Sequence, residues 1–219
     1  PIRRSQVIMI TSDRGLAGAL NTNLIRRAVE FMTHERPERI EDFDIVAVGR
    51  KGRDWLVRYG WPLVAEFTRI SDRPSIEAIR PIAEIATTDF INGKVDAVFV
   101  IYMHFINTLR QEPRVLQLLP IEPPEEVGEI ADYIFEPSPA AVLQALLPRF
   151  IEVQLYRALL EAVASEHSAR MVAMRNATQN ALDLVDELTL TYNKARQAQI
   201  TREVSEIAAG ANALGSVQA

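Results

Sequence analysis

Residues 149–209 read RFIEVQLYRALLEAVASEHSARMVAMRNATQNALDLVDELTLTYNKARQAQITREVSEIAA, with no glycine or proline. Pro148 precedes this stretch and Gly210 follows it, and the β-branched residues inside it only weaken a helix. Ser138 is the expected N-cap, with Pro139 at the first helical position. The sequence therefore predicts a helix of roughly 70 residues, on the order of 100 Å long. Pro148 is expected to kink this helix or to mark its true start.

A stripe of apolar and small side chains follows this helix at heptad spacing. Its first phase comprises Ala164, His167, Met171, Met174, Thr178, Ala181, Val185, Leu188, Tyr192 and Ala195. A second phase, offset as a stutter would produce, comprises Ile200, Val204, Ile207, Ala211 and Leu214. The sequence contains no second helical pattern of comparable length, so we expect a partner to cover the stripe, with His167 packing at that interface.

Strand-like and helix-like stretches alternate through the first half of the chain. The expected strands are Val7–Thr11, Asp44–Gly49, Leu63–Ile70 and Asp96–Tyr102, and helical patterns lie at 21–35, 53–59 and 76–86. The last strand is continuously apolar, as a central strand covered on both faces would be. The alternation predicts an α/β fold with a small, mostly parallel, Rossmann-like sheet domain at 1–137, followed by the long helix at 138–219.

A proline-rich segment at 111–139 interrupts this alternation. Two short candidate strands lie in it, Val115–Leu119 and Tyr133–Phe135. The acidic stretch Glu122–Glu129 between them is typical of an exposed loop.

Composition restricts the possible functions. The net charge of −5 provides no field that would attract nucleic acid. The absence of cysteine excludes disulfides, thiolate zinc sites and a cysteine nucleophile, and three scattered histidines do not indicate a metal site. No apolar run approaches the roughly 20 residues of a spanning helix, and no signal peptide is visible. Because the chain begins at Pro1, directly before a strand-like segment, we expect an upstream part to be missing.

Three local features have a structural and a functional interpretation. Ser12–Gly18 follows a strand but lacks the phosphate-loop spacing, so a tight turn is favoured, with Asp13 and Arg14 forming a turn cap and a local ion pair. Gly49–Gly52 is interpreted as a solvated turn, with anion or partner binding as the alternative. His104, at the end of an apolar strand, is expected to be a hydrogen-bonded structural residue.

Several motifs resemble those of one protein family. Ile200–Ala211, ITREVSEIAAGA, resembles the C-terminal signature of the γ subunit of F-type (F1Fo) ATP synthases, of the bacterial type. The other matching segments, in family order, are Thr11–Gly18, Val48–Gly52, Phe105–Thr108, Ala164–Met174 and Tyr192–Gln197. Family members begin with a long N-terminal helix, which this chain lacks.

The resemblance implies a function. The long helix would belong to an antiparallel coiled coil with the absent N-terminal helix, forming a non-catalytic rotor shaft without cofactor or metal. The shaft would couple proton flow to ATP synthesis or hydrolysis at the α and β subunits of the F1 ring. Its other partners would be the ε subunit and the c-ring, at the cytoplasmic face of the inner or plasma membrane, where the protein would be peripheral.

The resemblance also assigns roles to five residues. Arg196, Gln197 and Thr201 match family positions that touch a loop of the β subunit, where arginine can bind carboxylate with two hydrogen bonds. Arg170 and Glu206 match positions that are linked to coupling within the shaft or at its β-subunit contacts.

Two other classes of protein share some of these features. An α/β small-molecule-binding or enzymatic domain could oligomerise through its long helix, but no nucleophile–base–orienter set appears in the sequence. A plain coiled-coil adaptor would leave the α/β domain unexplained.

Overall fold

A computed structural model describes residues 3–34, 42–121, 136 and 138–215. The chain forms two compact units, Pro1–Ala173 and Met174–Ala219. The expected strand Tyr133–Phe135 and the expected acidic loop Glu122–Glu129 lie outside the described residues.

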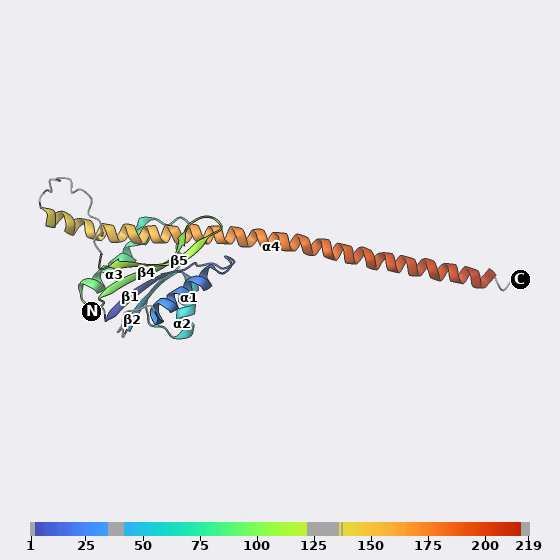
Figure 1. Ribbon diagram of the computed structural model, residues 1–219, viewed down its shortest axis with the longest axis horizontal. Helices are drawn as coiled ribbons and strands as arrows, with labels where there is room; N and C mark the ends of the chain where they lie inside the picture. The colour runs from blue at the N-terminus through green and yellow to red at the C-terminus, as the bar shows by residue number, and fades with distance from the viewer. Residues whose placement is uncertain (1–2, 35–41, 122–135, 137, 216–219) are drawn as a thin grey trace. The chain divides into compact units, whose positions relative to one another are not determined.

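The first unit contains a five-stranded sheet in the order β3-β2-β1-β4-β5 (Figure 1). Strands β1 to β4 are parallel, and β5 pairs antiparallel with β4. The strands are β1 (Arg4–Ile10), β2 (Asp42–Val48), β3 (Leu63–Phe67), β4 (Ala97–Phe105) and β5 (Gln111–Leu119). The predicted mostly parallel α/β sheet is confirmed, and β2 and β4, which flank the central strand β1 in the sheet, are both parallel to it.

Helices cover both faces of this sheet. They are α1 (Leu20–Thr33), α2 (Arg50–Tyr59), the 3₁₀ helix η1 (Ile76–Ala78), α3 (Arg80–Ile91) and the start of α4 (Pro139–Gly215). Alternate residues of β1 point to opposite faces. Met9 packs in the core with Leu24 of α1, whereas Ile8 packs in a second core with Ile82 of α3 and Leu155 of α4. Hence the α1 and α2 helices cover one face, and α3 and α4 cover the other (Figure 1).

Several element boundaries differ from the sequence prediction: β3 ends at Phe67 rather than Ile70, and β5 begins at Gln111 rather than Val115. Strand β4 continues to Phe105, three residues beyond the predicted end, because β5 pairs with it along that length. Gly49–Gly52 is not a turn between elements, because α2 begins at Arg50. Gly49 has φ +94°, which lets the chain pass from β2 into this helix.

The start of α4 follows the predicted cap. Ser138 Oγ accepts a hydrogen bond from the backbone N–H of Ala141 at 3.3 Å. The helix spans 77 residues and continues through Pro148, so this proline is not its start. Its residues up to Ala173 belong to the first unit.

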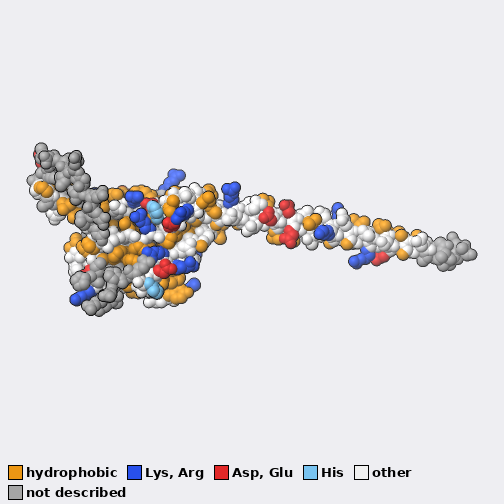
Figure 2. All heavy atoms as spheres, viewed as in Figure 1, with side chains coloured by type: hydrophobic (Ala, Val, Ile, Leu, Met, Phe, Trp, Pro, Cys, Tyr) orange, Lys and Arg blue, Asp and Glu red, His pale blue; other side chains and the backbone are white. Residues whose placement is uncertain are grey.

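The second unit is the remainder of α4. Its apolar side chains stay at the surface: Leu188 is 59% exposed, Tyr192 65% and Ile207 72% (Figure 2). Nearly every described residue of this unit is exposed, so the part of the predicted stripe that lies in this unit has no cover among the described residues. Within these residues, no helix is both long and apolar enough to cross a membrane.

Candidate functional site

Three of the five predicted contact residues share one face of α4 in the second unit. With about 100° of rotation per residue, Arg196, Gln197 and Thr201 lie within an arc of about 140°. Ile200 lies between them on the same arc, so an apolar side chain sits among the polar ones. All four side chains are exposed. The arrangement offers one cation and two neutral hydrogen-bonding groups around an apolar centre.

The side chain of Arg196 is exposed on this face. No hydrogen bond or ion pair involves its guanidinium among the residues that the structure describes. The neighbouring polar pair Gln199 and Glu203 is bonded within the helix at 3.1 Å. Arg196 therefore keeps all of its donors for a group outside this chain segment.

Glu206 does not join this face. It lies about 80° around the helix from Arg196, on the side away from Gln197 and Thr201, and about 15 Å further along the helix. The carboxylate of Glu206 is exposed. The structure thus separates Glu206 from the other three residues by helix geometry alone.

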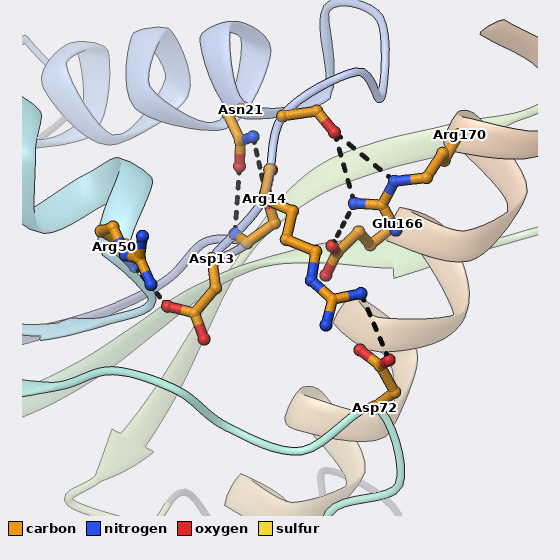
Figure 3. A network of polar contacts seen from close by, with 9 residues as sticks. Asp13, Arg14, Asn21, Arg50, Asp72, Glu166 and Arg170 are labelled. Carbon is orange, nitrogen blue, oxygen red and sulfur yellow. Dashed lines mark hydrogen bonds and ion pairs between the residues drawn. The ribbon is translucent and has the colours of Figure 1, made fainter. Parts of the chain in front are cut away.

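Arg170 belongs to the first unit and has partners there. Its guanidinium pairs with Glu166 one turn earlier on α4, and its Nε and Nη2 both lie 3.4 Å from the carbonyl oxygen of Gly15. Its side chain is 23% exposed. Arg170 therefore joins α4 to the loop between β1 and α1 (Figure 3).

The loop after β1 is held by a polar network, shown in Figure 3. Ser12 and Asn21 exchange two hydrogen bonds, at 3.1 and 2.8 Å. The carboxylate of Asp13 accepts the backbone N–H of Arg50 at 2.9 Å and that of Ile70 at 3.0 Å. Arg14 faces Asp72 at 3.6 Å. Asp13 therefore joins the ends of three loops rather than capping its own turn as predicted, and the partner of Arg14 is the distant Asp72 rather than a local residue.

His104 is a structural residue, as predicted. Its Nδ1 contacts Glu161 on α4, and Arg157 donates to the same carboxylate at 3.0 Å. Burial by itself would raise the pKa of Glu161, but the hydrogen bonds from His104 and Arg157 hold that pKa below its ordinary value of 4.5. This cluster fixes α4 against β4.

Sequence reasoning did not identify the charged residues around a cavity in the first unit. Arg69 and Glu166 both line it, yet they lie on elements far apart in the sequence. Arg69 has a left-handed backbone with φ +63°, which no residue pattern indicated. The only sequence signal was the polar loop Ser12–Gly18 directly after a strand.

Comparison with known proteins identifies the family. A family model described as "ATP synthase" matches residues 1–214. The ATP synthase gamma chain of Roseiflexus castenholzii is 54% identical over 212 residues, covering 96% of this chain and 73% of that protein. The corresponding protein of Chloroflexus aurantiacus is 50% identical over 216 residues, covering 98% and 74%.

Solved structures agree with this assignment. A chain in the central stalk and c-ring structure of the Tetrahymena thermophila mitochondrial ATP synthase matches with a TM-score of 0.63 at 27% identity, covering 81% of this chain and 78% of that one. A chain in the Euglena gracilis mitochondrial ATP synthase matches with a TM-score of 0.71 at 20% identity, covering 99% and 75%, and shows the shared fold. The chain therefore belongs to the ATP synthase gamma chain family.

Proposed function

We propose that this chain acts as the central rotor shaft of an F-type ATP synthase, coupling proton flow to ATP synthesis or hydrolysis at the α and β subunits. The observation that carries this function is the second unit, a single exposed helix that bears an apolar stripe and an arginine, Arg196, that has no bonded partner within the described part of the chain. Such a surface is suited to contact with neighbouring chains rather than to chemistry. We propose that the chain itself catalyses no reaction and requires no cofactor.

The stripe supports a coiled coil. In the second unit, Val185, Leu188 and Tyr192 follow the 3-4 spacing of a heptad and are each more than half exposed. In the first unit, α4 carries exposed apolar residues at the same spacing, namely Leu143, Leu146, Phe150, Val153 and Leu160. An antiparallel helix from a segment upstream of residue 1 would cover this seam. We propose that 138–219 works as the shaft and 1–137 as its foot.

Arg196, Gln197 and Thr201 are the proposed contact with the β subunit. A partner shifts a conformational equilibrium only if it interacts differently with the two states. Changing a 1:99 population to 99:1 requires about 5.5 kcal/mol. A hydrogen bond to a charged group is worth about 1.5–3 kcal/mol. A bidentate bond from Arg196 to a carboxylate, together with steric exclusion by Ile200, therefore supplies the right order of energy.

Arg170 and Glu206 are proposed to contribute to coupling in different ways. Arg170 contacts Glu166 and the Gly15 carbonyl, so it would keep the foot rigid against α4 while torque passes along the helix. Glu206 faces another side of the helix and is free for a second contact at the F1 ring.

The remaining partners follow from the place of relatives in the complex. The Tetrahymena match is a chain of a central stalk and c-ring structure, and a Euglena match is described as a rotor. We propose that the foot of this chain meets the ε subunit and the c-ring. The chain would then be a peripheral part of a membrane complex, on the cytoplasmic face, with no role in nucleic-acid binding.

Assembly tests this function directly. The full-length subunit is co-expressed with its α and β subunits, and the complex is isolated through a tag on α. We expect it to co-purify with ATP-hydrolysing α and β and, in reconstituted membranes, to support ATP-driven proton pumping. Truncation after Ala173 removes the second unit and should abolish pumping, whereas truncation after Gly215 should preserve it. Full pumping without residues 174–219 would exclude the shaft function, and metabolite turnover by the chain alone would favour an enzyme.

A further inference from the structure

The first unit contains a cavity of about 520 Å³ at the carboxyl ends of its parallel strands. Thr11 and Ser12 follow β1, Arg50 follows β2, and Met103 comes from β4. From β1 the chain proceeds through β2 and β3 on one side, and then returns to β4 on the other. Open α/β sheets bind ligands at this kind of switch point. The position alone makes the cavity a candidate binding site.

The cavity has an apolar floor and a charged rim. Leu24, Met103 and Val163 contribute apolar surface, and α4 closes one side through Ala162 and Glu166. A volume of about 520 Å³ exceeds what a single inorganic ion needs and lies within the range of small-molecule sites. The floor and the rim together suit a molecule with one apolar or ring part and one charged part.

The carboxylates of the rim are already engaged. Asp13 accepts two backbone N–H groups, and Glu166 pairs with Arg170. Asp72 faces Arg14 at 3.6 Å. These acids therefore offer little to a cationic ligand.

Two of the three arginines that line the cavity are available, whereas Arg14 faces Asp72. Among the described residues, no hydrogen bond or ion pair involves the guanidinium of Arg50 or that of Arg69, and both residues line the cavity. The first backbone N–H groups of α2 are bonded to Asp13, the Ser12 carbonyl and Thr11 Oγ1. An anion here would be held by arginine side chains rather than by the helix end.

Arg69 is also held in an unfavourable backbone conformation. Its φ of +63° is left-handed, a region that non-glycine side chains disfavour. The hydrogen bond from the next residue, Ile70, to Asp13 maintains this conformation at 3.0 Å. Strain of this kind concentrates at ligand sites, where it positions a functional side chain.

We propose that this cavity binds a small phosphorylated molecule with an apolar or ring moiety, of the class of a nucleoside monophosphate. Arg50 and Arg69 bind the phosphate, since planar guanidinium groups match phosphate oxygens with paired hydrogen bonds. The ring lies on the floor formed by Leu24, Met103 and Val163. This function goes beyond the role of the chain as a shaft.

Calorimetric titration of the full-length chain tests the site, with AMP as the probe and adenosine and inorganic phosphate as its two separate parts. AMP should bind more tightly than either part. Arg50→Ala and Arg69→Ala should each weaken AMP binding about tenfold or more. Arg58→Ala, an exposed arginine on α2 that does not line the cavity, should leave the affinity unchanged. Equal affinity for AMP and phosphate, or unchanged binding in both rim variants, would overturn the proposal.

Photolabelling with azido-AMP in the assembled complex provides a second measurement, because the labelled subunit is identified after digestion. The label should fall on this chain within residues 10–24 or 159–166 and should be displaced by excess AMP. Ser71→Trp, which fills the rim from an exposed position, should prevent labelling of this chain. Absence of label from the unaltered chain would refute the site, while labelling of α and β is scored separately and leaves the shaft function untouched.

Discussion

The guanidinium of Arg170 on α4 points at the carbonyl oxygen of Gly15, with Nε and Nη2 both at 3.4 Å. These residues are 155 positions apart in the chain. Glu166, one turn away on the same helix, orients the guanidinium. Because Leu16, next to Gly15, has a left-handed backbone with φ +63°, the interaction fixes a loop that would otherwise relax.

Arg170→Ala should lower the stability of the first unit by about 1–2 kcal/mol, since it removes donors from a partly buried carbonyl and leaves Glu166 unpaired. Denaturant unfolding monitored by the fluorescence of Trp55 and Trp61 measures this, because both tryptophans belong to that unit. Arg175→Ala, an exposed arginine on the same helix, is the matched control and should have little effect. Equal midpoints for the two variants would show that Arg170 does not hold the loop.

Gly49→Ala should prevent folding or lower the free energy of unfolding by more than about 3 kcal/mol. A Cβ at Gly49 would lie 2.1 Å from the carbonyl oxygen of Thr11, and the residue has φ +94°. Gly60→Ala is the control that measures backbone strain without a steric clash, because Gly60 also has a positive φ, +69°, but has open space around it. This substitution should lower the free energy of unfolding by only about 1 kcal/mol. Thermal unfolding of both variants measures the difference, and similar losses would mean that collision at Gly49 is relieved by backbone movement.

Arg196→Ala should reduce ATP-driven proton pumping by the assembled complex, without changing the nucleotide affinity of isolated β subunits. The loss reflects the missing charge-assisted contact of about 1.5–3 kcal/mol. Lys194→Ala is the matched control, because Lys194 is exposed on the same helix but about 160° away around it. If pumping by the Arg196 variant equals that of the unaltered complex, Arg196 has no part in coupling.

Glu161 makes the stability of the first unit depend on acid pH. Its pKa is lower in the folded chain than its ordinary value of 4.5, through His104 and Arg157. A lowered pKa stabilises the fold above the unfolded-state value, and this contribution disappears as pH falls through the lower folded-state value. Glu161→Gln should therefore be less stable at pH 7 and should lose less stability below about pH 4.5. Unfolding midpoints from pH 7 to pH 3 test this, with the exposed Glu203→Gln as control.

The 219-residue chain by itself should associate through its uncovered stripe. Exposed apolar patches of this kind cause association when no partner covers them. Light scattering should show oligomers or aggregates at high concentration, and Val185→Glu with Leu188→Lys should reduce them. A monodisperse monomer at high concentration would contradict this expectation.

The sequence by itself determined the elements whose patterns are local. The glycine- and proline-free stretch 149–209 and the cap at Ser138 were sufficient for the long helix, because backbone hydrogen bonds within a helix join residues four apart. The apolar runs around Val7 and Val98 indicated buried strands, because a strand that is covered on both faces is apolar at successive positions. Tertiary structure decided how these elements meet. It set the antiparallel pairing of β5, the continuation of α4 through Pro148, and the first turn of α2 at Arg50.

The two candidate sites differ in the same respect: the sequence indicated the contact residues on α4, whereas only the folded structure revealed the cavity. The roles assigned to Arg196, Gln197, Thr201 and Glu206 came from a family resemblance carried by contiguous motifs, and helix geometry alone sorts these residues onto faces. The cavity could not be predicted, because Arg50 and Arg69 follow different strands and Glu166 comes from α4. Parallel strands place their carboxyl ends at one edge of a sheet, so only the strand order decides which loops become neighbours there. That order is a property of the folded chain and leaves no periodic mark in the sequence.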